Sequence, residues 1–541
     1  MTHTKLLLHD AAREKLLRGA TALADAVRVT LGPRSKSVLI EREYGAPIVC
    51  DDGVTIAKAF SLKDHEENLG ARMLREAATR TGERVGDGTT TATLLAHALF
   101  AEGLRNVVAG ASAIELKRGI ERGSQLVVQV LRSLSRPTDT RARRAQVATV
   151  SAHDDGTIGE RVAEAMEKVG ADGVVSLEEA KGTETSLEVV EGLQFDQGYL
   201  SPYFVTGTEK MEAVLEEALI LLHDKRISST QALLPVLEKV VKLGRPLLVL
   251  CEQVEGDALA TLVVNKLRGT FACAAAKAPG YGDRRKAMLE DFAILTGGQV
   301  TGDERGITLE TLAEEDLGRA KRVVLTRETT TIIGGGGDRA AIQARCAELR
   351  RQLELATSDY EREKLAERLA KLSGGVAVIR VGAPSEAELK RLKEAYEDAI
   401  AATKAAVAEG IVPGGGVALL RAIPAVQAAE REAQGDERTG LRVLARALEA
   451  PARQIAANSG FDPGVIVERL GRETGTNGFD ARSGRFVDLF EAGILDPTRV
   501  VRLALENAVS VAGTLLLAEA TLTQIEDEGP ARRKHGEESF E

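Results

Sequence analysis

The segment Gly86-Asp87-Gly88, which is followed by three threonines, is the clearest candidate for chemistry in the sequence. Glycines let the backbone approach a ligand closely, so that its amide groups can point at an anion. The threonines stand where a helical pattern begins, and the N-terminus of a helix favours phosphate. Asp87 has the carboxylate that Mg²⁺ requires beside a phosphate. The segment indicates a phosphate site, although an ordinary glycine-rich helix start is the commoner explanation of such a pattern alone.

Two other turns carry weaker signals of the same kind. Residues 412–417 place three glycines before a second helical pattern, and residues 30–33 form a Thr-Leu-Gly-Pro turn. Alone, each is better explained as a closely packed turn. Their joint presence in the two ends of the chain, which have the same character, favours a single site that both ends build.

The elements that must position these turns are mainly helices. Apolar residues recur at helical spacing over residues 9–30 and 64–135, and Ala/Leu-rich helical patterns return over residues 385–525. Short β-like runs at 38–40 and 48–50 flank a Tyr-Gly-Ala-Pro turn, which predicts a hairpin.

The middle of the chain has a different pattern. Helical segments alternate there with short Val-rich runs, which predicts an α/β fold. Residues 338–372 read as two antiparallel helices, and Ser358 and Glu361 have the spacing of a capping box for the second one. Matching ends around a different middle predict a multidomain α/β protein in which one domain interrupts another. The Val-rich runs lie at 173–177, 187–190, 219–222 and 246–251.

Composition excludes several classes of protein. The 541 residues carry a net charge of −10, which argues against a broad nucleic-acid-binding surface. The four cysteines show no CxxC spacing and the seven histidines no HxxxH pair, so we expect buried thiols and no zinc site. The apolar run near the N-terminus is too short for a signal peptide, and no run is long enough to span a membrane. The expected compartment is the cytoplasm.

Over nearly its whole length the sequence resembles the bacterial GroEL-type (group I) chaperonins. The resemblance extends from Leu16-Leu17-Arg18-Gly19 to Gly493-Ile494-Leu495-Asp496-Pro497, and chance agreement over so many separate segments is negligible. The matching segments include TLGP from residue 30, DGVTIAK from 52, GDGTTTAT from 86, VEGLQFD from 190, GYLSPYF from 198, KAPGYGDRRKAML from 277, ATSDYEREKL from 356 and GGGVAL from 414.

The resemblance implies a three-domain plan. Both chain ends form a mostly helical equatorial domain, thin intermediate segments follow, and an α/β apical domain is inserted in the middle. The implied boundaries are 1–135 and 411–525 for the equatorial domain, 136–190 and 377–410 for the intermediate segments, 191–376 for the apical domain, and 526–541 for a disordered charged tail.

The resemblance also implies an ATP site with Mg²⁺ on Asp87. Asp398 and Asp52 would orient the attacking water, so that the chemistry is positioning and electrostatics. Without the resemblance, Asp398 would be read as a solvated helix carboxylate. The residues implied around the nucleotide are Thr30, Leu31, Gly32, Pro33, Asp51, Asp87, Gly88, Thr89, Thr90, Thr91, Gly414, Gly415, Asp480, Ala481 and Asp496.

Two apolar helical segments, 229–244 and 255–269, are wider than one buried face needs. Periodicity alone favours a broad core-facing stripe. The resemblance instead implies a surface at a ring opening that binds non-native polypeptides and, in competition with them, a GroES-type lid. It also implies a homo-oligomer of two stacked seven-membered rings. The residues implied at this surface are Tyr199, Tyr203, Phe204, Leu234, Leu237, Leu259, Val263 and Val264.

Several positions depart from the family pattern. Asp51 stands where some members have lysine, Asp480 replaces an asparagine, Gln197 replaces an arginine, and the tail RRKHGEESFE replaces a Gly/Met-rich repeat. Asp51 either points into solvent or recruits a cation, K⁺ or a second Mg²⁺, beside the phosphates. Because Asp52, Asp87 and Asp398 are all present, we expect a specialised paralogue with ATPase activity. The competing hypotheses are a passive holding scaffold and a small-molecule phosphotransferase.

Overall fold

The computed structural model describes residues 2–41, 47–170, 173–180, 182–207, 210–302, 306–356 and 358–526. Two compact units divide the chain. Unit 1 contains Met1–Ala163 and Glu394–Glu541, and unit 2 contains Glu164–Lys393. The prediction of a multidomain α/β fold, in which two ends of the chain combine around an inserted middle, is confirmed.

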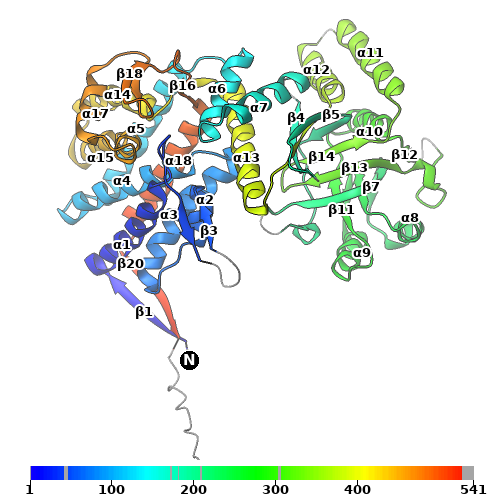
Figure 1. Cartoon of the computed structure of the whole chain (residues 1–541). Helices are drawn as coiled ribbons and strands as arrows, with labels where there is room; N and C mark the ends of the chain where they lie inside the picture. The colour runs from blue at the N-terminus through cyan, green and yellow to red at the C-terminus, as the bar shows by residue number, and fades with distance from the viewer. Residues whose placement is uncertain are drawn as a thin grey trace, which may run out of the picture. The chain divides into compact units, whose positions relative to one another are not determined.

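Unit 1 is a bundle in which N-terminal and C-terminal helices alternate, as the blue and red elements of Figure 1 show. Helix α18 packs against α3 and α4, and α15 packs against α5, so leucines and alanines from both chain ends share one core. Two helices, α7 and α13, continue from this unit into the other. The helices are α1 (His9–Arg28), α2 (Gly53–Ala59), α3 (His65–Val85), α4 (Thr89–Val108), α5 (Ala113–Leu134), α6 (Arg141–Ser151), α7 (Gly156–Val169), α13 (Glu386–Glu409), α14 (Val417–Glu432), α15 (Gly435–Ala447), α16 (Ala450–Asn458), α17 (Pro463–Arg472) and α18 (Thr498–Leu516).

Small antiparallel sheets complete the described part of unit 1. They are β1 (Thr2–Leu8) with β20 (Ala520–Glu526), β2 (Val38–Ile40) with β3 (Ile48–Cys50), β16 (Ile411–Pro413) with β19 (Leu495–Pro497), and β17 (Asn477–Asp480) with β18 (Arg485–Asp488). The predicted hairpin at 38–50 is confirmed, while residues 42–46 of its turn lie outside the described residues. Strand β20 extends one residue into the predicted tail, and residues 527–541 also lie outside.

Unit 2 is built on a mixed sheet in the strand order β11-β9-β7-β13-β14-β6, with β12 added beside β7. Its central strands are buried on both faces, which explains their continuous runs of Val, Leu and Ile. The strands are β6 (Gly192–Phe195), β7 (Ala213–His223), β9 (Leu247–Cys251), β11 (Cys273–Lys277), β12 (Val300–Thr301), β13 (Gly318–Leu325) and β14 (Thr330–Gly335).

Smaller sheets and the helices of unit 2 surround this mixed sheet. Strand β15 pairs with β4 and β5, and β8 pairs with β10. Helices α11 and α12 form the predicted helix pair, but Ser358 makes no capping hydrogen bond, so the predicted capping box is wrong. The elements are β4 (Val174–Glu179), β5 (Ser186–Val190), β8 (Arg226–Ile227), β10 (Gln253–Val254), β15 (Val376–Val381), η1 (Pro202–Phe204), α8 (Thr230–Leu243), α9 (Gly256–Leu267), α10 (Asp283–Thr296), η3 (Glu314–Asp316), α11 (Arg339–Leu355) and α12 (Asp359–Gly374).

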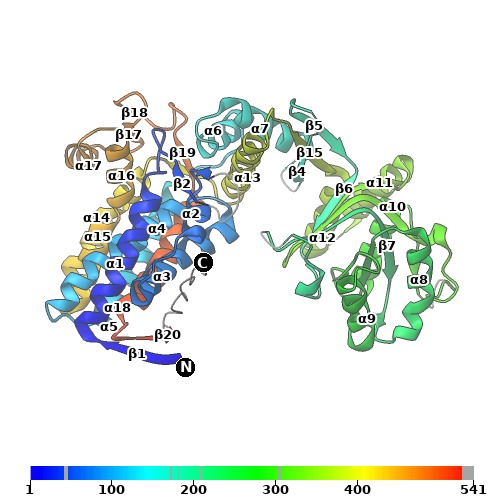
Figure 2. The ribbon, with the colours of Figure 1, turned by 60° about the horizontal axis from the view of Figure 1, so that its bottom comes forward.

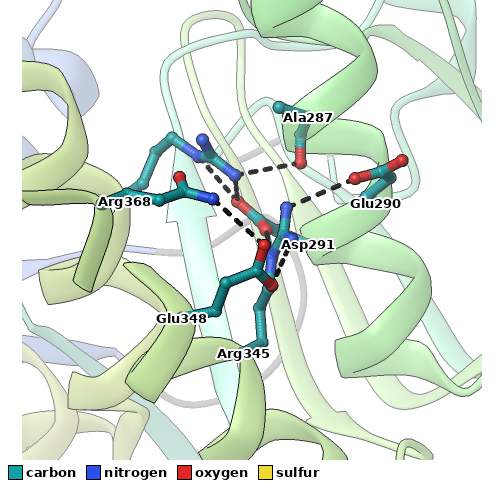
Figure 3. Close-up of polar contacts among 7 residues, drawn as sticks. Ala287, Glu290, Asp291, Arg345, Glu348 and Arg368 are labelled. Atoms are coloured by element: carbon teal, nitrogen blue, oxygen red, sulfur yellow. Dashed lines mark hydrogen bonds and ion pairs between the residues drawn. The ribbon is translucent and has the colours of Figure 1, made fainter. Parts of the chain in front are cut away.

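A buried carboxylate joins three of these helices (Figure 3). Asp291 of α10 is buried and accepts hydrogen bonds from Arg345 Nε of α11 and Arg368 Nε of α12, each at 2.8 Å. Arg345 also contacts Glu348 at 2.9 Å and Glu290 at 3.4 Å. Each arginine donates in the fixed geometry of its guanidinium, so the network sets how α11 and α12 lie against α10.

The four cysteines are buried and unpaired, as predicted. Burial raises the pKa of the Cys50 thiol to about 11 and the pKa values of Cys251 and Cys273 to about 12, so these thiols remain protonated and unreactive. Within the described ranges, no helix is both long and apolar enough to cross a membrane.

Candidate functional site

A cavity of about 430 Å³ lies within unit 1, where the glycine turns of the two chain ends meet. All the residues predicted to surround a nucleotide line this cavity, except Gly414. Both aspartates that are predicted to orient water line it as well. The predicted residues that line it are Thr30, Leu31, Gly32, Pro33, Asp51, Asp52, Asp87, Gly88, Thr89, Thr90, Thr91, Asp398, Gly415, Asp480, Ala481 and Asp496.

The first glycine turn ends at the N-terminus of α4. Gly88 is the N-cap residue and has a φ of 78°, and a Cβ there would lie 2.6 Å from Val500 Cγ1. Only glycine therefore fits this position. Thr90 Oγ1 lies 3.1 Å from Thr30 Oγ1, which joins this turn to the 30–33 turn. The free backbone amides of the first turn of α4 thus border the cavity, as an anion site requires.

The 30–33 turn is fixed from the C-terminal half of the chain. The side-chain amide of Asn458 donates to the carbonyl oxygens of Arg28 at 2.9 Å and of Leu31 at 2.8 Å. Gly32 has a φ of 92° and packs against Ile455. This wall of the cavity therefore depends on α16 as well as on the end of α1.

The triple-glycine turn joins β16 to α14. The Gly414 amide donates to Ile494 O at 3.0 Å, and a Cβ on Gly414 would lie 3.0 Å from Asp496 Oδ1. Gly414 lies next to Asp496 and is not among the residues that line the cavity, so its contact with nucleotide stays a prediction. Gly415 and Gly416, with φ values of 65° and 77°, complete the turn at the cavity wall.

Asp87 and Asp52 lie on different elements and are held by different partners. Ser151 Oγ donates to Asp87 Oδ2 at 2.8 Å, and the Gly88 amide donates to Oδ1. Asp52 is the N-cap of α2 and accepts from the amides of Val54 at 3.2 Å and Thr55 at 2.8 Å. The helix cap explains how Asp52 keeps one orientation beside the cavity.

Three carboxyls at the cavity resist ionisation. Burial, followed by the neighbouring carboxylates, raises the pKa of Asp398 well above its usual range and the pKa of Asp496 to about 7. Burial also raises the pKa of Asp87, against hydrogen bonds that lower it. The described residues form no group of three or more His, Cys, Asp or Glu side chains around one metal position. The Asp87 carboxylate by itself has oxygen donors that suit Mg²⁺, which would complete its coordination with phosphate oxygens and water.

The raised pKa of Asp496 predicts how pH affects the stability of the nucleotide-free protein. Between about pH 4 and pH 7 the unfolded chain loses the proton that the folded protein keeps, so this group destabilises the fold increasingly as pH rises through that window. We expect Asp496→Asn to raise the melting temperature at pH 8 more than at pH 5. Calorimetry at both pH values checks this, and equal shifts would show that Asp496 ionises normally.

Asp480 behaves differently from the other carboxyls. Burial favours its protonated form, but hydrogen bonds from the Ser483 hydroxyl and from the Arg482 and Ser483 amides outweigh burial and lower its pKa. It is therefore a carboxylate, which only accepts hydrogen bonds, whereas the asparagine that it replaces can also donate them.

Several residues of the cavity wall carry no sequence motif. Ser151 ends α6, His153 and Asp154 come from the turn between α6 and α7, and Arg482 comes from the β17–β18 hairpin. His153 Nε2 lies 3.8 Å from Asp51 Oδ2, and both side chains line the cavity and are partly exposed. No motif marks these turns, and only the packing of the bundle brings them to the cavity.

A second candidate site lies on unit 2, where α8 and α9 are neighbours (Figure 2) and η1 packs against α9. Tyr203, Leu234 and Val264 are 63%, 47% and 42% exposed. Tyr199, Leu259 and Val263 are partly buried against the core. Phe204 and Leu237 are buried within the core, so the prediction that these two side chains line an accessible surface is wrong. Val241 and Leu267, which the prediction omitted, are exposed on the same helices.

Comparison with known proteins gives consistent matches over the chain. Residues 23–526 match the TCP-1/cpn60 chaperonin family. The sequence is also 62% identical over 525 residues to a protein of Bradyrhizobium diazoefficiens named chaperonin GroEL 5, a match that covers 97% of each chain.

Proposed function

The chain belongs to the TCP-1/cpn60 chaperonin family and is therefore a chaperone for protein folding, and from this premise we propose an ATP-driven cycle. In this cycle unit 2 captures non-native polypeptides and unit 1 hydrolyses ATP. The protein would assemble as two stacked seven-membered rings and enclose its client under a GroES-type lid. Its proposed cofactors are ATP and Mg²⁺, with K⁺ as an auxiliary cation.

One observation carries the proposal of hydrolysis. Asp52, Asp87 and Asp398, which lie far apart in the sequence, all line the cavity that the glycine turns border. Asp87 would hold Mg²⁺, which would neutralise phosphate charge when bound. Asp52 and Asp398 would orient the attacking water and accept its proton. The N-terminus of α4 would bind phosphate oxygens through its backbone amides.

The direct test is steady-state hydrolysis of ATP by the purified full chain, with and without Mg²⁺. We propose turnover that requires Mg²⁺ and supports refolding of a denatured client with a lid protein. Bound client that is never released, together with negligible hydrolysis, would favour a passive holding scaffold instead. The excess of aspartates around the cavity is the observation that favours this second candidate, since they repel a triphosphate.

The proposal of client capture rests on helices that are apolar on two faces. On α8, Leu233, Val236, Leu237 and Val240 are buried in the core, while Leu234 and Val241 remain exposed. A helix that only packs against the core needs apolar residues on its buried face alone, so an apolar exposed face indicates a binding role. Exposed apolar area is what a binder of many non-native proteins requires, because such area is the feature that they share. A lid segment with apolar side chains would compete for the same surface.

A charge on the exposed face should block capture without unfolding the protein. We expect Leu234→Glu to lower the affinity for a denatured client about tenfold or more, because an ionised carboxylate must lose water against apolar chains. Binding of a fluorescent denatured client measures this effect, with ATP hydrolysis and the melting temperature as controls.

Two matched variants make the test specific. Gln231→Glu adds the same charge at an exposed polar position of α8 and should change capture little. Leu237→Glu places the charge in the core and should unfold unit 2. If Leu234→Glu behaves like the Leu237 variant, residue 234 serves packing and the proposed surface is wrong.

A further inference from the structure

The cavity of unit 1 is poorly matched in charge to a triphosphate. Seven aspartates line it, whereas the cationic groups among its described lining residues are Arg482 and, when protonated, His153. Burial raises the pKa values of three of the seven, Asp87, Asp398 and Asp496, and the remaining four aspartates still outnumber the cationic groups. A group on the protein that contacts an anion would therefore contribute strongly to affinity in this chain.

His153 is placed to be that group. Its Nε2 lies 3.8 Å from Asp51 Oδ2, and both side chains are partly exposed to the cavity that they line. The Asp51 carboxylate follows β3, directly before the Asp52 cap of α2, while His153 comes from the turn between α6 and α7. The contact thus joins two parts of the cavity wall that are about 100 residues apart.

The backbone at His153 adopts an unusual conformation. His153 and Asp154 have φ values of 53° and 71°, and two successive non-glycine residues in the left-handed region are strained. The Asp154 amide donates to Thr149 O at 2.8 Å, and the Asp154 carboxylate pairs with Arg482, whose carbonyl accepts from Arg34 at 2.9 Å. These contacts hold the strained turn against the cavity.

We propose that His153 is a phosphate-binding residue of the ATP site and that Asp51 is its charge partner. The imidazole donates to phosphate oxygens when nucleotide is bound, and in the free protein it lies beside the Asp51 carboxylate. Asp51 without His153 repels the phosphates. The proposal rests on ATP binding in this cavity, as proposed above, and it explains the departure at position 51 as half of a pair.

A double-mutant cycle with ligands of different phosphate number tests the pair. Affinities for MgATP, MgADP and adenosine are measured by calorimetry or by competition in the full chain, for Asp51→Asn, His153→Asn and both together. Asparagine tolerates the left-handed backbone, so it removes the imidazole without altering the turn. His9 is the matched control, because it also has a positive φ, 54°, and pairs with a carboxylate, Glu519, away from the cavity.

We expect His153→Asn to weaken MgATP binding about tenfold, MgADP less, and adenosine less than about twofold. Adding Asp51→Asn should restore most of the lost affinity, and His9→Asn should change none of the three. The proposal is wrong if His153→Asn weakens all three ligands equally or leaves the affinity for MgATP unchanged. It is also wrong if the effects of the two substitutions on affinity are additive. If the unmodified protein binds no nucleotide, the proposed function fails, and this inference fails with it.

Discussion

Replacing Asp398 by alanine is expected to slow ATP turnover about a hundredfold while changing ATP affinity no more than a few-fold. Asp398 lies on α13 and lines the cavity. Burial and the charges of Asp87 and Asp52 raise its pKa, so it accepts a proton more readily than an ordinary carboxylate. A group that acts only on the attacking water contributes to the transition state and hardly to binding.

Single-turnover hydrolysis and equilibrium ATP binding separate these two effects. Asp398→Asn should be as slow as the alanine variant, because it preserves the shape but cannot accept the proton. Glu397→Gln changes the neighbouring carboxylate of α13, which does not line the cavity, and should leave turnover within about twofold. A parallel loss of binding and turnover in the Asp398 variants would assign this residue to the structure of α13.

Replacing Asp291 by alanine is expected to lower the free energy of unfolding of unit 2 by about 3–5 kcal/mol. Asp291 accepts from Arg345 and Arg368 in a buried position (Figure 3), and its loss leaves their charges poorly compensated between α10, α11 and α12. The chain contains no tryptophan, so circular dichroism and limited proteolysis during urea unfolding are the suitable measurements.

The network also provides its own control. Glu290 lies at its exposed edge, 3.4 Å from Arg345, and Glu290→Ala should cost less than about 1 kcal/mol. Replacing Asp291, Arg345 and Arg368 together with leucine and methionines should cost less than the Asp291 change alone, because no buried charge remains. Equal losses for Asp291→Ala and Glu290→Ala would mean that the network does not hold the three helices together.

Local pattern predicted several elements of the fold. Helical spacing predicted α1 and the α11–α12 pair, and the Val-rich runs predicted β7 and β9, because burial imposes those periods directly. The capping box at Ser358 failed because spacing does not fix side-chain rotamers. The exposed face of α8 could not be told from its buried face, because both faces are apolar.

The site was predictable only where motif or family resemblance marked it. The turns around Gly88 and Gly415 carry motifs, and the structure brings them together. The turn that holds His153 and Asp154 carries no motif, and neither does Arg482, since the role of an unpatterned loop depends on what it packs against. Position 51 was recognised from the sequence as a departure. Its proximity to His153 could not be predicted, because the two residues are about 100 positions apart and come together only in the fold.

The pairing of β1 with β20 affects how the chain is made. Thr2 is opposite Glu526, so the first strand of unit 1 finds its partner only when the last strand has left the ribosome. At roughly 5–20 residues per second, synthesis of unit 2 alone takes on the order of 10–50 s. During that time the apolar faces of α1, α3 and α4 remain uncovered, because α18, which packs against α3 and α4, has not yet been synthesised. A nascent copy of this chaperone therefore displays the kind of surface that a finished copy is proposed to capture.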